Sequence, residues 1–190
     1  VVRGLTIRSQ GFNNDGVDPE MSTDVLIEDC HFYTSDDGVA IKAGRDADGR
    51  RIARPTRRVV VQRCNVYPNE MAKRTGEGAR NGLAIGSEGS AGIHDIWVVD
   101  CSFTGRSRGI FVKSNTDRGG AYTNLNFHRN RVESAKSEAI RFSMDFGGKT
   151  QGDHPPKFSD INITHLTCVS AGKALTVKGL TSSPIQRLSM

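Results

Sequence analysis

The chain has 190 residues, enough for one domain with its own hydrophobic core. Its formal net charge of +5 favours anionic partners. It contains no apolar run of about 18 residues and no signal-peptide pattern at its start, so we expect no membrane span in this sequence.

One strand pattern returns along the chain at intervals of about thirty residues, which is typical of stacked supersecondary units. A faint first copy places Val2, Leu5 and Ile7 ahead of Gly16. Each clear copy consists of a longer segment followed by a shorter segment that starts at glycine or alanine. In chain order these copies are Val25–Phe32 with Gly38–Lys42, Val59–Val66 with Gly82–Gly86, Ile96–Phe103 with Gly109–Lys113, Asn124–Val132 with Ala139–Phe142, and Ile161–Cys168 with Ala174–Lys178.

Each copy reads as strand, turn and strand, because short β-branched runs alternate with polar residues and end in Gly, Asn or Asp. No segment shows sustained helical periodicity. We therefore predict an all-β, parallel β-helix that forms one domain over residues 1–190, with equivalent residues stacked about 4.8 Å apart. The alternative is an antiparallel sandwich, whose strands would not keep the same cysteine and glycine columns in register.

The cysteines follow the repeat. Cys30, Cys64 and Cys101 occupy one column, which Asn130 and Leu166 continue. We interpret the column as an inward ladder of small apolar thiols rather than a disulfide framework. No CxxC pair or Cys/His spacing indicates a metal site, and none is predicted.

Both ends of the chain look cut. The first residues already lie inside a repeat, and Pro184–Leu188 resembles the start of another coil. Solenoids need caps over their open strand edges, and no cap is visible in the sequence. We expect an excerpt of a longer protein, so the missing signal peptide says nothing about its destination.

Arginines are concentrated in one loop-like stretch after the second strand of the first clear copy. Nucleic acid is one partner that such charge could bind, but no aromatic residues for base stacking are interleaved with the arginines. An acidic polysaccharide suits the same charge without that requirement. The alternative is a solvated loop, partly neutralised by Asp46 and Asp48. The arginines are Arg45, Arg50, Arg51, Arg54, Arg57 and Arg58.

Two acidic clusters lie one repeat apart, the first around Asp15 and Asp18 and the second at Asp36 and Asp37. Asp15 and Asp37 share a repeat column, each directly before a glycine. Two like charges about 4 Å apart repel by about 4 kcal/mol at an effective dielectric of 20. One carboxyl should therefore keep its proton near neutral pH while its neighbours stay ionised, as glycoside cleavage requires. The alternatives are ordinary turn residues or a calcium site.

The acidic clusters carry a family resemblance. Asn13–Asp18 followed by Asp36–Gly44 resembles the signature of glycoside hydrolase family 28, the polygalacturonases and their relatives, and Gly44–Arg51 resembles bacterial exo-acting members. Ile85–Glu88 and Lys113–Gly120 continue the match. The resemblance implies a right-handed, single-stranded parallel β-helix without a cofactor. It also implies a secreted or periplasmic monomer that hydrolyses galacturonan-type pectic polysaccharide with inversion at the anomeric carbon.

Carried over residue by residue, the resemblance makes Asp36 the general acid that protonates the leaving oxygen. Asp15 and Asp37 would then activate the attacking water. The alternatives are a rhamnogalacturonan or other pectic-glycan hydrolase of the same family, and a β-helix that binds anionic glycans without cleaving them. A calcium-dependent pectate lyase is a third, which the preserved aspartate spacing disfavours.

The resemblance also places substrate-binding residues. Lys113, in the family's Arg-Ile-Lys position, would pair with a uronate carboxylate, and Arg45 belongs to the run shared with exo-acting members. Because Lys42 and Lys178 occupy the repeat column of Lys113, the alternative for Lys113 is one rung of a solvated ladder.

The chain departs from the family pattern around the sugar. Asn81 stands where the family has histidine, Phe111 replaces the arginine of Arg-Ile-Lys, and Phe146 replaces a tyrosine. The carboxylates remain, which indicates retained chemistry with an altered pocket in which Asn81 is a binding candidate. Arg141 shares the column of Phe111 one coil later and could reach the vacated carboxylate site, the alternative being a salt bridge at the rim with Glu138 or Asp145.

Overall fold

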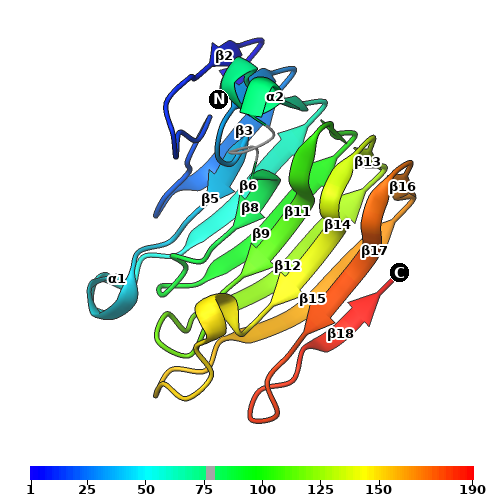
Figure 1. Ribbon diagram of the computed structural model, residues 1–190. Coiled ribbons are helices and arrows are strands. Elements are labelled where there is room, and N and C mark those ends of the chain that lie inside the picture. Colours follow the sequence, from blue (N-terminus) through cyan, green and yellow to red (C-terminus); the bar gives the residue numbers. More distant parts are fainter. Residues whose placement is uncertain (76–79) are drawn as a thin grey trace.

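Three parallel β-sheets run along the computed structural model, which describes residues 1–75 and 80–190 (Figure 1). A complete turn of the chain gives one strand to each sheet, and each strand pairs in parallel with its equivalent in the next turn. The chain therefore winds into stacked coils, and the predicted parallel β-helix is confirmed.

The sheets differ in length. The seven-stranded sheet contains β1 (Val2–Arg3), β3 (Thr23–Glu28), β6 (Thr56–Gln62), β9 (Ile93–Val99), β12 (Ala121–His128), β15 (Lys157–Thr164) and β18 (Gln186–Ser189). The six-stranded sheet contains β2 (Thr6–Arg8), β4 (His31–Thr34), β7 (Asn65–Pro68), β10 (Ser102–Phe103), β13 (Arg131–Val132) and β16 (Thr167–Cys168). The five-stranded sheet contains β5 (Val39–Ile41), β8 (Asn81–Ile85), β11 (Arg106–Lys113), β14 (Ala135–Ser143) and β17 (Ala171–Lys178).

A complete turn contains three strands, whereas the repeat pattern predicted two. One residue with positive φ divides the longer segment of each copy into two strands, and there the chain passes from the seven-stranded sheet to the six-stranded sheet. Polar residues occupy this position, and on neighbouring turns they pair: the Arg63 guanidinium binds Asp29, and that of Arg129 binds Asp100. The dividing residues are Asp29, Arg63, Asp100, Arg129 and His165, with φ of 55°, 51°, 53°, 51° and 55°.

Inward side chains of the three sheets fill the coil. Cys30, Cys64 and Cys101 are buried there, all four cysteines are free, and the predicted thiol ladder is confirmed. Asn130 continues the column as a buried polar residue. Its amide is satisfied, because Nδ2 donates to the Val98 carbonyl at 2.8 Å and Oδ1 accepts from the Cys101 amide at 3.0 Å.

Three short helices interrupt the coil in the described residues: α1 (Asp46–Ile52), α2 (Glu70–Thr75) and the 3₁₀ helix η1 (Phe146–Gly148). The arginine-rich stretch was expected to be a loop, and this was wrong for α1, which projects from the side of the coils (Figure 1). Acidic residues in its first turn and basic residues in its last suit the helix dipole, but its few apolar residues leave no periodicity to detect. Among the described helices, none combines the length and apolar character needed to cross a membrane.

A column of glycines stands at the corner that leads into the five-stranded sheet. Here neighbouring turns approach so closely that a side chain would collide with backbone. A Cβ at Gly16 would lie 2.3 Å from the Gly38 carbonyl oxygen, one at Gly38 would lie 2.6 Å from that of Gly82, and one at Gly82 would lie 2.5 Å from that of Gly109. Only glycine permits this approach, so the column fixes the position of the residue before each glycine.

Candidate active site

The residues that precede these glycines form a polar ladder across successive turns. The bridge between Val17 and Val39 sets Asp15 beside Asp37, which confirms the shared column predicted from the repeat. The strand register then extends this column beyond the two acids. In order along the coil its members are Asp15, Asp37, Asn81, Arg108 and Glu138.

Three carboxylates converge at the start of this ladder. Oxygens of Asp15, Asp36 and Asp37 all lie within 4.8 Å of one another. Asp15 Oδ1 accepts a hydrogen bond from the Asp37 amide at 3.0 Å. Asp37 Oδ1 accepts bonds from the backbone N of Asn81 at 3.2 Å and from its Nδ2 at 2.6 Å. The acids that the sequence places 21 residues apart are therefore neighbours in space.

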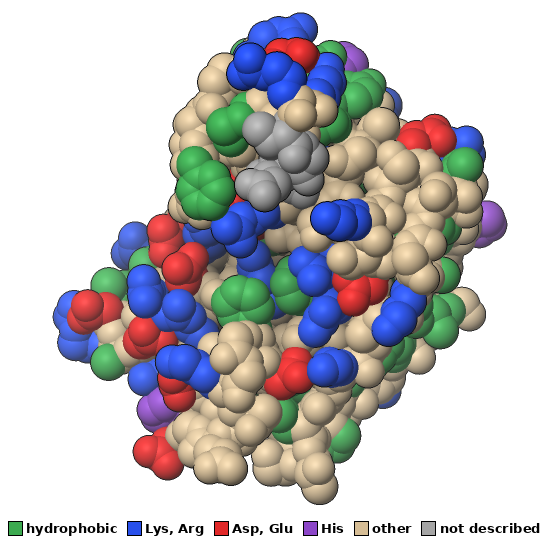
Figure 2. All heavy atoms as spheres, viewed as in Figure 1, with side chains coloured by type: hydrophobic (Ala, Val, Ile, Leu, Met, Phe, Trp, Pro, Cys, Tyr) green, Lys and Arg blue, Asp and Glu red, His purple; other side chains and the backbone are tan. Residues whose placement is uncertain are grey.

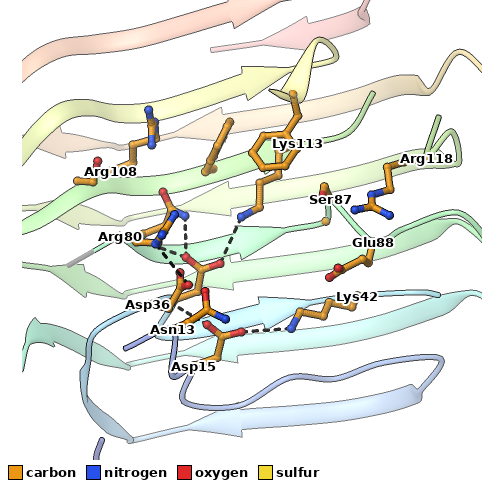
Figure 3. A pocket seen from close by; sticks show the side chains of 16 residues that line it. Asn13, Asp15, Asp36, Lys42, Arg80, Ser87, Glu88, Arg108, Lys113 and Arg118 are labelled. Atoms are coloured by element: carbon orange, nitrogen blue, oxygen red, sulfur yellow. Dashed lines mark hydrogen bonds and ion pairs between the residues drawn. The ribbon is translucent and has the colours of Figure 1, made fainter. Parts of the chain in front are cut away.

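Built-in cations neutralise part of this negative charge, as the close view shows (Figure 3). Lys42 Nζ lies 3.2 Å from Asp15 Oδ2, and Lys113 Nζ lies 3.4 Å from Asp37 Oδ2. In the described residues, the ion pair of Asp36 is longer, with Arg80 Nε 3.5 Å from its Oδ2. Because ammonium and guanidinium groups of the chain already bind these carboxylates, we do not assign a metal to the cluster.

The protonation equilibria separate the acids. Burial, followed by the charges of Asp37 and Asp15, raises the pKa of Asp36 to about 7, against the opposing charges of Arg80 and Lys113. A carboxyl with this pKa carries a proton over part of the neutral range. One member of the cluster can therefore donate a proton while its neighbours accept hydrogen bonds as carboxylates.

Asp18 is a fourth acid that the sequence analysis did not assign to the site. Its Oδ2 accepts a 2.5 Å bond from Lys42 Nζ, so Lys42 bridges Asp18 and Asp15. Burial and the charge of Asp15 raise the pKa of Asp18 to about 6, although the hydrogen bond from Lys42 opposes the rise. The contact with Asp18 therefore helps to hold the Lys42 ammonium beside Asp15.

A groove of about 420 Å³ opens over the cluster, along the outside of the five-stranded sheet. Figure 2 shows Lys and Arg side chains gathered around the hollow on this face. The lining includes Asp15, Asp36, Asp37 and Glu88 among the acids, and its cations are Lys42, Arg80, Arg108, Lys113 and Arg118. This mixture suits a ligand that carries both hydroxyl groups and negative charge.

Two aromatic rings form one wall of the groove. Phe111 and Phe146 meet edge to face, with ring centroids 6.1 Å apart. Lys113 Nζ lies 5.4 Å from each centroid, within the range of a cation–π interaction. At these two positions, where the family pattern has arginine and tyrosine, the wall is apolar with one ammonium in front of it.

The predicted substrate-binding residues have different positions. Lys113 and Asn81 line the groove. Arg45 lies in an adjoining hollow of about 160 Å³ that shares Arg118 and Phe146 with the groove. Arg141 is not part of the described lining, and its guanidinium binds Glu138 Oε1 at 3.1 Å, the contact foreseen as the alternative.

The charged lining residues that the sequence analysis did not assign to the site include Arg80, Arg108, Arg118 and Glu88. Arg108 lies over the Phe111 ring at 4.8 Å and binds Glu138 Oε2 at 2.8 Å. It could have been found, because it precedes a glycine of the same column as Asp15 and Asp37. Arg118 binds Asp46 at 2.8 Å, and the Glu88 carboxylate makes no hydrogen bond or ion pair with the rest of the described chain. Glu88 and Arg118 carry no signal in the repeat, but they lie within the runs Ile85–Glu88 and Lys113–Gly120 that resemble the family.

Comparisons with known proteins agree with this geometry. The model of glycosyl hydrolases family 28 matches residues 3–188. A probable polygalacturonase from Vitis vinifera is 27% identical over 190 residues, which cover 97% of this chain and 37% of the relative. An endo-polygalacturonase from Pectobacterium carotovorum subsp. carotovorum is 28% identical over 160 residues, covering 84% of this chain and 35% of the relative.

A solved structure is similar along the whole chain. The crystal structure of a hyperthermoactive exopolygalacturonase from Thermotoga maritima matches with a TM-score of 0.89 and 32% identity. The match covers 98% of this chain and 40% of that protein. The chain thus spans two fifths or less of the length of these relatives.

Proposed function

Since this chain belongs to glycosyl hydrolases family 28, we propose that it carries the catalytic centre of an enzyme that hydrolyses galacturonan-type pectic polysaccharide. The observation that carries the proposal is the convergence of Asp15, Asp36 and Asp37 within 4.8 Å at the floor of a basic groove. The names of the relatives, all polygalacturonases, support the substrate class.

In this mechanism Asp36 is the general acid and protonates the glycosidic oxygen as the bond breaks. Its raised pKa supports this role, because the acid must be protonated at the working pH. Asp15 and Asp37 act as the bases that take a proton from the attacking water. Asp37 is oriented by Asn81 and Lys113, and Asp15 by Lys42 and the Asp37 amide.

Inversion at the anomeric carbon rests on family membership. The carboxylate oxygens lie within 4.8 Å of one another, closer than the roughly 6.5–9.5 Å usual between the two acids of an inverting enzyme. We still propose inversion, with the water held between Asp15 and Asp37. The anomer formed first, followed by ¹H NMR during cleavage, should be the inverted one, and a retained anomer would refute this part of the proposal.

Substrate carboxylates would bind along the basic groove. Lys113 is the first anchor, and Arg108, which lines the groove although it also pairs with Glu138, is a second. Asn81 lines the floor, and Arg45 would contact a neighbouring sugar in the adjoining hollow. The aromatic wall of Phe111 and Phe146 favours a second candidate, a rhamnogalacturonan or other pectic glycan whose sugar presents an apolar face there.

Product analysis tests the function. We expect the full-length protein to release saturated oligosaccharides with new reducing ends from polygalacturonate or rhamnogalacturonan, and to do so in the presence of a chelator. Unsaturated products that absorb in the ultraviolet and disappear on chelation would identify a lyase. Binding of polygalacturonate without cleavage would identify a glycan-binding β-helix. Which polymer is cleaved decides between the two hydrolase candidates.

Activity should fall as the pH rises through about 7. The pKa of Asp36 is raised to about 7, so its protonated fraction decreases above that pH and the general acid is lost. The pH dependence of kcat/KM on a neutralised oligosaccharide should therefore show an alkaline limb near pH 7. A rate that stays constant up to pH 9 would contradict the role of Asp36 as the acid.

The enzyme is proposed to be a secreted or periplasmic monomer. A polymeric pectin is too large to enter a cell, so the enzyme must meet it outside the cytoplasm. Action as a monomer is proposed from the family resemblance.

A further inference from the structure

Arg106, the first residue of β11, is a buried cation close behind the acid cluster. It is 1% exposed, and no carboxylate of the described chain lies within ion-pair distance of its guanidinium. Burial lowers the pKa of Arg106 to about 10, which still leaves the group charged at neutral pH. A buried charge without a carboxylate partner is costly, so something in its surroundings must compensate for it.

Backbone carbonyls provide that compensation. The guanidinium donates to the carbonyl oxygens of Thr34 at 2.8 Å, Tyr67 at 3.0 Å and Asn81 at 3.0 Å, and it also donates to the carbonyl of Asp36. These acceptors come from the two turns of the coil that precede the turn of Arg106. One side chain therefore ties three successive turns together at the corner that leads to the acids.

Two of these carbonyls belong to the catalytic geometry. The Asp36 carbonyl is part of the peptide that joins Asp36 to Asp37. The Asn81 carbonyl belongs to the residue whose amide groups hold Asp37 Oδ1. A shift of Arg106 would move the backbone that carries the acid and the residue that orients the base.

The charge of Arg106 also acts on the cluster. Asp37, Asp36 and Asp15 all interact electrostatically with the guanidinium. Within the part of the chain that the structure describes, the other charged groups around Asp36 lie on the groove side: Asp37 and Lys42 from its own turn, Asp15 from the turn before, Arg80 from the next turn and Lys113 from the turn after that. Arg106 is the cation that approaches from the interior, where no solvent screens it.

We propose that Arg106 is a positioning residue for the acid cluster, one that holds the Asp36–Asp37 peptide and Asn81 in place and favours the ionised bases by its charge. The proposal rests on the hydrolase function proposed above. The four acceptors account for positioning, because a planar guanidinium can serve several carbonyls in fixed directions. The interior location accounts for the effect of its charge.

Two substitutions separate the charge from the geometry. Arg106→Gln removes the cation, and both limbs of the kcat/KM profile should move to higher pH by about one unit, because the acid and the bases lose a stabilising positive charge. Arg106→Lys keeps the charge but cannot reach four carbonyls. Its kcat should fall about tenfold with both limbs within a few tenths of a pH unit of wild type. Arg129→Gln removes an exposed cation paired with Asp100, and should leave the profile unchanged.

The outcomes are distinguishable from failure of the proposed function. A ¹³C NMR titration of the Asp36 carboxyl needs no turnover, and its midpoint should also rise by about one unit in Arg106→Gln. If the limbs of the kcat/KM profile and the NMR midpoint of Asp36 stay at the wild-type pH in Arg106→Gln, the electrostatic role is overturned. If Arg106→Lys keeps the wild-type kcat, the positioning role is overturned. If Arg106→Gln does not fold, the kcat of Arg106→Lys decides the positioning role, and limbs of Arg106→Lys displaced by a full pH unit would overturn the electrostatic role. A wild-type protein that cleaves no pectic polymer refutes the hydrolase, while the NMR midpoint still tests Arg106.

Discussion

Asp36→Asn is expected to lower kcat about 10³-fold on whichever pectic polymer the wild-type enzyme cleaves. Asparagine has the shape of the protonated acid but cannot release a proton to the leaving oxygen, and general acid catalysis contributes about 10²–10⁴-fold. Substrate affinity should change little, because the groove cations that bind the polymer are untouched. Initial rates of reducing-end release give kcat and KM.

The same substitution should leave the fold intact and stabilise it above pH 7. The pKa of Asp36 is raised in the folded state, so the folded protein binds a proton more tightly than the unfolded chain does. Wild-type stability should therefore fall as the pH rises from about 4 to about 7, and Asp36→Asn removes that loss. Thermal unfolding at pH 5 and pH 8 measures the difference.

Asp29→Asn is the matched control for charge, since Asp29 is an exposed aspartate paired with Arg63 at 2.7 Å. It should retain wild-type kcat and lack the gain in stability at pH 8. Turnover by Asp36→Asn at more than a tenth of the wild-type rate would reject Asp36 as the general acid. Asp18, whose pKa is raised to about 6, would then be the next candidate for that role.

Asp37→Asn is expected to lower kcat by about 10²- to 10³-fold and to weaken the fold as well. The oxygen of the new amide can keep both bonds from Asn81, but its NH₂ group would face the Lys113 ammonium, which then loses its carboxylate partner. A buried donor without a partner costs about 1–3 kcal/mol. Chemical denaturation should show that loss, and steady-state kinetics the fall in kcat.

The pH profile gives a second signature of Asp37→Asn. The charge of Asp37 is one of the factors that raise the pKa of Asp36, so its removal should lower that pKa and move the alkaline limb to lower pH. Asp100→Asn, which neutralises an exposed partner of Arg129, should leave the limb in place. An alkaline limb that moves upward, or does not move, in Asp37→Asn would show that the two carboxyls do not interact as described.

The repeat in the sequence was sufficient to predict the parallel β-helix and the approach of the acids at the centre of the site. Stacked parallel turns follow from a strand pattern that returns at nearly constant intervals, and a shared column means a shared position in space. This reasoning predicted the thiol ladder of Cys30, Cys64 and Cys101 and the approach of Asp15 to Asp37, and both are present.

Local features without periodicity could not be predicted. The residue that divides the longer segment of each copy into two strands, such as Asp29, differs in type from turn to turn. Its positive φ therefore could not be predicted from the repeat. Helix α1 is too short and too polar for a helical period.

Contacts across turns needed the folded chain. Columns state which residues align, but not how far a long side chain reaches or which charge it meets. Arg141 was placed correctly beside Phe111, and its guanidinium lies 5.5 Å from the centre of that ring, but it also pairs with Glu138. Arg106 reaches the carbonyl of Thr34, 72 residues earlier, through the interior of the coil. Such pairings arise because a buried charge is stable only when it is hydrogen-bonded. The packed turns alone bring an acceptor within hydrogen-bond distance.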